Sequence, residues 1–308
     1  MSSMTTLEKV CDRVANMARS HHDKMISVDD VSFNDLETIC ISGEPHRLRN
    51  MAQQSICYRL GIPINYLRKC PPDLQINHLN YWMKNEKREK LFFRFDGDEI
   101  RSIFTPRYIP TDNKQILDRL LDLGYRPNTR VQCSLDDEFM LVSLPDERES
   151  FRVNGDRMTP GIAVSNSEVG LASLSISAFI LRLVCTNGMV SKTSFSASYR
   201  HVSDKLLSNL PGVLNSLRSG VGQQKERFAI SLGTKVDNPE ATIESFNRQF
   251  ELRKEEKEAV DWALREELGF TMFAIVNVYT KSSQYELLSA ESRFRLQKVG
   301  GAILGMVA

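Results

Sequence analysis

The chain has 308 residues, of which 41% are hydrophobic and 26% charged, and its formal net charge is +1. A chain of this size can bury a sizeable core divided between two or three lobes. The near-zero charge argues against a uniformly basic nucleic-acid binder, and the apolar runs are far shorter than the ~20 residues of a membrane span. The polar N-terminus and the scattered cysteines, without a C-x-x-C pair, indicate a cytoplasmic protein with reduced thiols.

Residues 1–90 are predicted to form a helical N-terminal lobe. Apolar residues recur at helical spacing over residues 5–22 and again over residues 47–60, so each segment presents one apolar face. Gly61 is expected to end the second helix in the left-handed conformation, and Pro72 occupies a favoured first position of a third helix. The helix at residues 5–22 packs on its own lobe or, alternatively, binds a partner.

Residues 91–235 are predicted to form an α+β core. Short apolar or alternating segments are joined by tight turns, and the pair Asp96 and Gly97 is a strong hairpin signal. The strands are expected at residues 91–95, 100–104, 131–135 and 138–144 and in a hairpin over 161–185, with a helix at 111–123. Because the connections are short, we expect one central, mostly antiparallel sheet of about six strands with helices packed on it.

The second strand of the last hairpin carries the most informative pattern. Apolar side chains alternate with Ser173, Ser175 and Ser177, which is typical of a strand with one buried face. The strand then becomes apolar on both faces, with Arg182 as its only charge. A buried guanidinium needs an acceptor, so we expect a structural ion pair at Arg182 ahead of a ligand contact.

Residues 236–308 are predicted to form a C-terminal helical lobe. Residues 202–218, just before it, favour a helix. Residues 241–268 show the pattern of one long amphipathic helix, and a further helix closes the chain. Residues 237–270 hold ten acidic and five basic side chains, so this lobe is expected to repel phosphate.

Established catalytic motifs are absent from the sequence, including the nucleophile elbow, H-E-x-x-H, the P-loop and the dinucleotide-binding glycine pattern. No histidine pair has the i, i+3 or i, i+4 spacing of metal ligands, so we expect no metal and no cofactor. The paired carboxylates Asp96/Asp98 and Asp136/Asp137 lie at predicted turns, where aspartate is common. A metal-dependent nuclease built on them is the less favoured alternative to a protein without catalytic residues.

Charge is unevenly distributed along the chain. Residues 171–225 hold six basic and one acidic side chain, and residues 81–130 hold eleven basic, eight acidic and eight aromatic ones, whereas residues 131–170 hold three basic and eight acidic. Cations follow phosphates and rings stack on bases, which is the combination that single-stranded nucleic acid requires. We therefore predict a basic face that binds single-stranded DNA. Its expected contact residues are Arg94, Arg101, Arg107, Tyr108, Arg182, Lys192, Tyr199, Arg200 and His201.

Several short segments form a recognisable set of motifs. They are residues 51–54, 60–67, 79–82, 101–108 (RSIFTPRY), 164–170 (VSNSEVG), 182–189 (RLVCTNGM), 200–201 and, less closely, 271–280. Together they resemble a phage- and plasmid-borne family that is described as domain of unknown function 932. The resemblance covers most of residues 45–305 and implies no particular reaction.

The strand-rich centre followed by a helix is also similar in architecture to ring-forming phage single-strand annealing proteins. Those proteins hold DNA by its backbone in a basic groove on each subunit, so the similarity implies a mobile-element protein that binds single-stranded DNA and promotes annealing or recombination as a homo-oligomer. The alternative is a protein-interaction module, such as a phage regulator or anti-defence factor. The near-neutral charge, the helix at residues 5–22 and the acidic C-terminal lobe favour that alternative.

Overall fold

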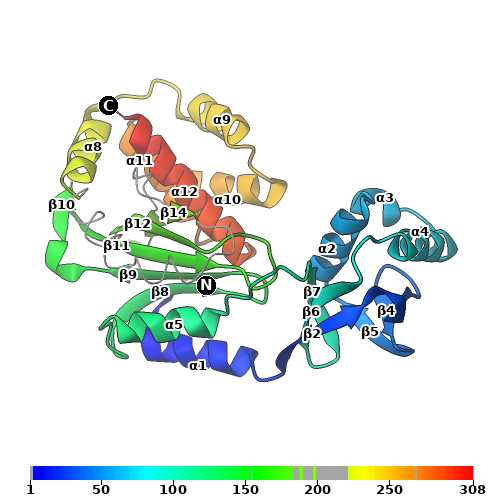
Figure 1. The fold of residues 1–308 in the computed structure, drawn as a ribbon. Helices are drawn as coiled ribbons and strands as arrows, with labels where there is room; N and C mark the ends of the chain where they lie inside the picture. The colour runs from blue at the N-terminus through cyan, green and yellow to red at the C-terminus, as the bar shows by residue number, and fades with distance from the viewer. Residues whose placement is uncertain are drawn as a thin grey trace. The chain divides into compact units, whose positions relative to one another are not determined.

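The computed structural model describes residues 3–153, 155–182, 187–189, 197–198, 221–267 and 269–307. The chain divides into two compact units. The small unit comprises residues 12–112 and 167–172, and the large unit comprises residues 1–11, 113–166 and 173–308. Figure 1 labels the helices and strands of both units, and the α+β class expected from the sequence is confirmed.

The small unit is built on a six-stranded sheet. Its strands are β2 (His21–Ser27), β6 (Lys90–Asp96), β7 (Glu99–Phe104), β5 (Glu44–Leu48), β4 (Thr38–Ile41) and β3 (Val31–Phe33), in spatial order. All neighbours are antiparallel except the parallel pair β5 and β7. The hairpin that the Asp-Gly turn predicts is present as β6 and β7, with Gly97 at φ +55°.

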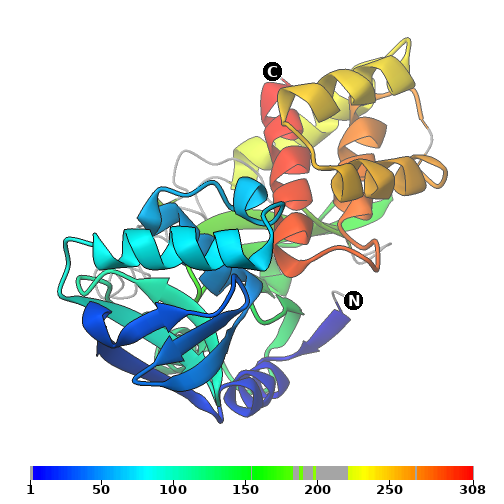
Figure 2. The same cartoon turned by 90° about the vertical axis from the view of Figure 1, so that its right-hand side faces the viewer.

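Three helices cover one face of this sheet (Figures 1 and 2). They are α2 (Asn50–Leu60), α3 (Ile64–Leu67) and α4 (Pro72–Lys84). Gly61 ends α2 at φ +69°, and its N–H donates to the carbonyls of Cys57 and Tyr58, as expected for a left-handed cap. Ile56 of α2 and Leu79 of α4 are fully buried against the sheet, so the apolar faces of these helices and of the strands form one core.

Residues 1–90, expected to be helical, also contain the strands β2, β3, β4 and β5. These strands are three to seven residues long, and β2 exposes most of its side chains, so no period-2 apolar pattern marks it in the sequence. Its partner is β6, with His21 opposite Asp96. Because this pairing joins distant segments, the small unit does not coincide with the expected boundary between residues 90 and 91.

The large unit contains an eight-stranded antiparallel sheet. Its main order is β1 (Ser3–Thr6), β8 (Arg130–Leu135), β9 (Met140–Pro145), β11 (Asp156–Asn166), β12 (Ser175–Arg182) and β13 (Asn187–Met189), and β10 (Phe151–Val153) and β14 (Ala197–Ser198) pair with β11 and β12. The predicted hairpin is present as β11 and β12. The single sheet expected for residues 91–185 is therefore wrong, because the β6–β7 hairpin belongs to the other sheet.

The serines of β12 are buried rather than exposed to solvent. Ser175 and Ser177 share a face with Ser165 of β11, and all three are as inaccessible as the apolar residues between them. Alternation predicts the two faces of a strand but not whether the polar face meets water, and small hydroxyl side chains can be covered by a second layer. Figure 1 shows α5 (Asn113–Asp122) on one side of this sheet and α11 and α12 on the other.

Helices form the C-terminal part of the large unit. They are α8 (Val221–Gly233), α9 (Pro239–Gln249), α10 (Lys254–Leu264), α11 (Met272–Ser282) and α12 (Ala290–Met306). The Tyr279 hydroxyl of α11 donates to Asn247 Oδ1 at 2.8 Å and to the Ile243 carbonyl at 3.0 Å, which ties α11 to α9. The expected closing helix is confirmed as α12.

The single helix expected over residues 241–268 is instead two helices. The chain turns at Glu251, which has φ +49°, and the neighbouring Leu252 is buried. Glu256 then accepts a hydrogen bond from the Arg253 N–H at 2.9 Å and begins α10. The burial of Leu252 and the helix caps on either side of it, at Phe250 and Arg253, therefore interrupt the helix despite the continuous helical pattern of the sequence. The helix expected over residues 202–218 lies outside the described residues.

Helix α1 (Leu7–Met17) passes from the large unit into the small unit, and its expected apolar face is buried at Leu7, Val10 and Val14. Among the described residues, no helix is both long enough and apolar enough to cross a membrane.

Candidate functional site: a buried charge cluster and an exposed aromatic surface

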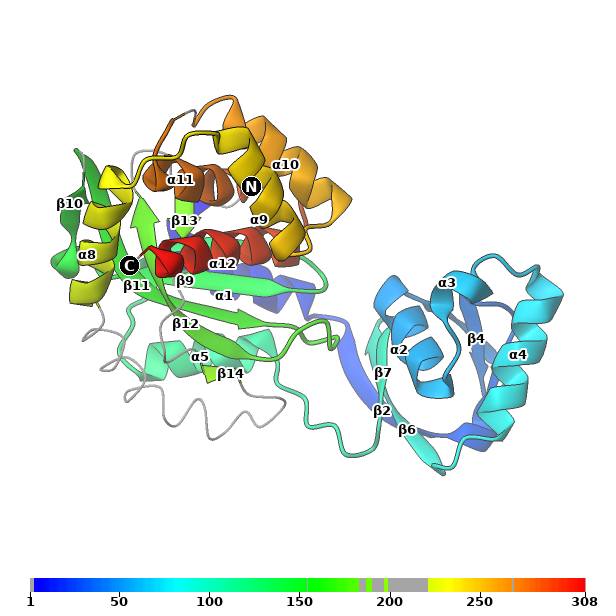
Figure 3. The ribbon, with the colours of Figure 1, turned by 90° about the horizontal axis from the view of Figure 1, so that it is seen from above.

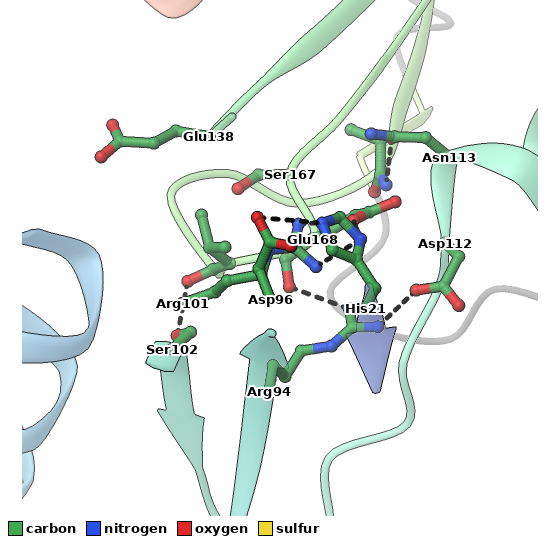
Figure 4. A network of polar contacts seen from close by, with 12 residues as sticks. His21, Arg94, Asp96, Arg101, Ser102, Asp112, Asn113, Glu138, Ser167 and Glu168 are labelled. Carbon is green, nitrogen blue, oxygen red and sulfur yellow. Dashed lines mark hydrogen bonds and ion pairs between the residues drawn. The ribbon is translucent and has the colours of Figure 1, made fainter. Parts of the chain in front are cut away.

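Two arginines lie inside the small unit, one on each strand of the β6–β7 hairpin. Arg94 is 2% exposed and Arg101 is 4% exposed. Together with the polar side chains around them they form what we call the buried charge cluster: His21, Asp23, Arg94, Asp96, Arg101, Asp112 and Glu168. Figure 4 labels all of these residues except Asp23. A charged group at this depth is stable only when partners satisfy it.

The Arg94 guanidinium is fully engaged. Its Nε donates to Asp23 Oδ1 at 3.0 Å, its Nη1 donates to the Glu168 carbonyl at 3.0 Å, and its Nη2 contacts Asp112 Oδ1. Burial alone would lower the pKa of Arg94, but the carboxylates of Asp112 and Asp23 outweigh burial and raise it. Arg94 is therefore a permanent cation whose charge is neutralised inside the protein.

Arg101 joins Glu168 and His21. Its Nη2 donates to Glu168 Oε2 at 2.6 Å, and its Nη1 lies 3.0 Å from His21 Nδ1. A guanidinium can only donate, so Nδ1 of His21 is the acceptor and the ring proton is on Nε2, which faces Asp96 Oδ2 at 3.9 Å. Burial, and then the positive charge of Arg101, lower the pKa of His21, so this imidazole is neutral at pH 7.

The cluster holds a tip, residues 167–172, that connects β11 to β12 but packs in the small unit. Ser102 Oγ donates to the Val169 carbonyl at 2.9 Å, and the Tyr108 hydroxyl donates to the Glu168 carbonyl at 3.3 Å. The Tyr108 ring stacks on Phe104, with 3.7 Å between centroids and 3° between planes. The sequence segments 101–108 and 164–170, far apart in the chain, thus meet at this tip.

Gly170 completes the tip at a point of close approach. It has φ +86°, and a Cβ added there would lie 2.8 Å from Cε1 of Phe104. A side chain at this position would meet both backbone strain and the aromatic ring. Position 170 of the VSNSEVG segment therefore requires glycine for two reasons: its left-handed backbone conformation and the close Phe104 ring.

The arrangement of the cluster is suited to holding a loop in place. Three carboxylates (Asp23, Asp112 and Glu168) surround two guanidiniums, so there is no surplus positive charge for a phosphate. In the part of the chain that the structure describes, no group of three or more His, Cys, Asp or Glu side chains is arranged to hold a metal ion. The chemistry at this place is ion pairing and hydrogen bonding between protein groups.

The sequence-predicted contact residues have different environments. The structure brings Arg94, Arg101 and Tyr108 together around Glu168, whereas Arg107 is exposed and makes no hydrogen bond or ion pair with another described residue. Four further residues, Lys192, Tyr199, Arg200 and His201, lie outside the described residues.

Arg182 lies in the large unit. Its Nε donates to Asp156 Oδ2 at 2.6 Å and its Nη1 donates to both carboxylate oxygens of Glu267 at 3.2 Å. The guanidinium also lies over the Phe273 ring, 5.7 Å from its centroid. The structural ion pair expected for this arginine is confirmed.

Four residues of the cluster were not predicted from the sequence: His21, Asp23, Asp112 and Glu168. Their partners are far away in the chain, since Arg94 is 71 residues from Asp23 and Arg101 is 67 residues from Glu168. The available signal was the repeated appearance of charged residues in otherwise apolar strands. Each such charge requires an opposite one from elsewhere.

A second feature of the small unit is the outer surface of its helices. Four large rings are exposed there: Tyr58 at 90%, Tyr66 at 49%, Tyr81 at 62% and Trp82 at 46%. The Tyr81 and Trp82 rings contact each other edge to face at 5.3 Å, and Tyr66 of α3 contacts His78 of α4 at 6.0 Å. Figure 3 shows α2, α3 and α4 side by side. We call this surface, over residues 50–90, the aromatic surface.

The aromatic surface is also the basic part of the small unit. Residues 50–90 contain seven Lys and Arg against three Asp and Glu, although the whole chain carries only +1. The remaining residues therefore have a net negative charge. Most of the positive excess of residues 50–90 lies in the segments that follow α3 and α4, at Arg68, Lys69, Lys87, Arg88 and Lys90. The basic face predicted from the sequence contains only residues 81–90 of this segment, because helical periodicity predicts a packed lobe for the rest.

The family model described as Domain of unknown function (DUF932) matches residues 102–280, more than half of the chain. The chain therefore belongs to this family. No curated protein and no solved structure matches it. The matched range includes the segment 102–108 and the tip with Glu168, whereas both arginines of the buried charge cluster and the aromatic surface precede it.

Proposed function

We propose that the protein binds single-stranded DNA through the aromatic surface and acts without catalytic residues of its own. The observation that carries the proposal is that four exposed rings on α2, α3 and α4 lie in the segment 50–90, which has seven basic and three acidic side chains. Stacking contributes ~1–3 kcal/mol per base and is tolerant of sequence, and lysine and arginine follow the backbone. Arg94, Arg101 and Arg182 have no part in this surface, because their guanidiniums are used in internal ion pairs.

Trp82 allows a direct test. The chain has two tryptophans, Trp82 in the aromatic surface and Trp262 in α10 of the large unit. In a Trp262→Phe variant, Trp82 is the sole indole, so stacking of a base on it is expected to quench the fluorescence as oligonucleotide is added. An unquenched Trp82 at oligonucleotide concentrations that saturate binding would place the strand elsewhere.

Alanine variants test the rings as a group. Tyr81→Ala and Trp82→Ala are expected to weaken oligonucleotide binding about tenfold each, since ~1–3 kcal/mol of stacking is lost. Phe270→Ala is the matched control, because Phe270 is a large ring that is 69% exposed but lies in the acidic C-terminal part. Equal losses in all three variants would contradict the proposal.

Salt dependence separates this function from a protein-interaction module. Exposed Tyr, Trp and Arg are also typical of protein interfaces, so rings alone do not select the partner. Oligonucleotide affinity that falls steeply between about 50 and 200 mM salt supports phosphate contacts. Absence of binding at the lower salt removes the DNA proposal and favours a protein partner at the same surface.

The proposal includes annealing or recombination by an oligomer. Several subunits that each hold a strand raise the local concentration of complementary sequences and so speed pairing. The measurement is the rate at which two labelled complementary oligonucleotides pair, with the oligomeric state followed by light scattering. An unchanged pairing rate would restrict the function to binding.

A further inference from the structure

One cation of the aromatic surface, Arg59, has a buried donor without an acceptor among the described residues. Arg59 lies in the last turn of α2, directly after the exposed Tyr58. Its Nε atom is buried and has no hydrogen-bond partner, and its guanidinium makes no ion pair with any described residue. A buried donor without an acceptor is rare in folded proteins and requires an explanation.

A second positive charge lies near Arg59. Arg88, in the connection between α4 and β6, is close enough for its positive charge to act on Arg59. The one carboxylate that acts on Arg59 is Glu86, and it is already bound by Arg88, whose Nη1 donates to Glu86 Oε1 at 2.8 Å and whose N–H donates to the same oxygen at 3.2 Å. Glu86 is therefore bound by Arg88, and no described carboxylate forms an ion pair with Arg59.

The electrostatics agree with this geometry. Burial, and then the charge of Arg88, lower the pKa of Arg59, and Glu86 offsets this only in part. A second anion beside the two guanidiniums would offset their like charges. The planar guanidinium presents paired N–H donors that match two oxygens of a phosphate group.

We infer that Arg59 and Arg88 bind one phosphodiester of a nucleic-acid strand whose bases lie on the neighbouring rings of the aromatic surface. This inference rests on the proposed function and adds the anchoring phosphate to it. Arg59 supplies the directional donors and Arg88 the second charge. The adjacent Tyr58, almost fully exposed, is the nearest ring along the chain for the base of that nucleotide.

The test compares two cations of the same helical surface. Arg59→Met removes the charge and keeps an unbranched apolar stem, and Lys69→Met removes an exposed charge that has no buried donor. For Arg59→Met we expect oligonucleotide affinity to fall about tenfold or more and the salt slope to decrease by about one. For Lys69→Met we expect a loss of about threefold or less. Equal losses would overturn the anchor.

A second measurement uses inorganic phosphate alone. We expect phosphate to raise the melting temperature of the wild-type protein more than chloride at equal ionic strength, and expect Arg59→Met and Arg88→Met to abolish the difference. If the wild type binds DNA and Arg59→Met binds equally well, the anchor is wrong and the proposed function stands. If phosphate stabilises only proteins with Arg59 and no DNA binds, the anion site stands and the proposed function fails.

Discussion

Arg101 and Glu168 are 67 residues apart in the chain, yet Nη2 of the arginine lies 2.6 Å from Oε2 of the glutamate and both side chains are buried. The pair connects strand β7 to the tip that enters the small unit between β11 and β12. Ser102 and Tyr108 bind the backbone of the same tip. The position of the tip is therefore fixed both by this ion pair and by hydrogen bonds to the backbone carbonyls of the tip.

Breaking this pair is expected to destabilise the small unit strongly. Arg101→Met leaves the buried Glu168 carboxylate without its ion-pair partner, and Glu168→Gln leaves Arg101 without a counter-charge, so each is expected to cost about 3–5 kcal/mol. The measurement is urea unfolding followed by Trp82 fluorescence in a Trp262→Phe background. Arg47→Met, which removes a mostly exposed partner of Glu99 in the same unit, is the control and is expected to cost less than about 1 kcal/mol.

The double variant Arg101→Met with Glu168→Gln completes the cycle. Because both charges are then gone, its loss of stability is expected to be smaller than the sum of the two single losses. Additive losses would show that the two side chains act independently and that the 2.6 Å contact contributes nothing.

Gly170→Ala is expected to destabilise the same tip for a steric reason. A left-handed conformation costs a non-glycine residue about 1–2 kcal/mol, and contact with the Phe104 ring at 2.8 Å adds about 1–3 kcal/mol of overpacking. Gly43→Ala is the matched control: its φ is +88° and nothing lies within 4 Å of an added Cβ. The difference between the two variants in urea unfolding measures the ring contact. Equal destabilisation would mean that the Phe104 side chain moves away from the added methyl group without a measurable cost in stability.

The local structure of this chain follows from its sequence, but the pairing of distant segments does not. The Asp-Gly turn predicts β6 and β7, Gly61 predicts the end of α2, and alternation predicts β12, because each of these depends on residues close together in the chain. Which sheet the β6–β7 hairpin joins depends on β2 and β5, whose short polar strands carry no periodic signal.

The buried charge cluster could not be predicted for the same reason, because its ion pairs join distant segments. A charged residue in an apolar strand can equally face a ligand groove or an internal partner. The sequence around Arg94 and Arg101 does not distinguish these two cases. The partners that decide it, Asp23 and Glu168, come from a strand edge and a turn. In the aromatic surface, helical spacing predicts the buried face of α2 but does not predict which rings remain exposed or that cations lie in the same segment.

The stability of the small unit is expected to depend on pH through His21. Its pKa in the folded protein is lower than the ordinary 6.5, so the unfolded chain binds the proton more readily. Stability is therefore complete above pH 6.5 and falls as pH decreases from there toward the folded pKa. The pKa of Asp96, lowered below 3.8 by Ser20 and Arg49 against the effect of burial, adds a separate loss at much lower pH.

The variant His21→Asn tests the upper of these two ranges. Asparagine offers an oxygen that can accept from Arg101 but does not titrate. Urea midpoints of the small unit, read from Trp82 at pH 7.5 and 5.5, are expected to decrease on acidification in the wild type and to change less in the variant. An identical decrease in both proteins would assign the pH effect to groups other than His21.

Arg182 makes the corresponding prediction for the large unit. Arg182→Met leaves Asp156 and Glu267, both mostly buried, without the cation that binds them, and is expected to cost about 3–5 kcal/mol. Arg182→Lys keeps the charge but not the fork that reaches both carboxylates at once, so an intermediate loss is expected. The readout is the unfolding of Trp262 in a Trp82→Phe background, which follows the large unit alone.

An exposed pair in the same unit supplies the control for Arg182. Arg248 contacts Glu244 one helical turn away at 3.6 Å, and both side chains are 71% exposed, so Arg248→Met is expected to cost less than about 0.5 kcal/mol. If Arg182→Met unfolded at the same urea concentration as this control, the guanidinium would be free to serve a ligand. The strand that carries it would then regain the DNA-contact role expected from sequence.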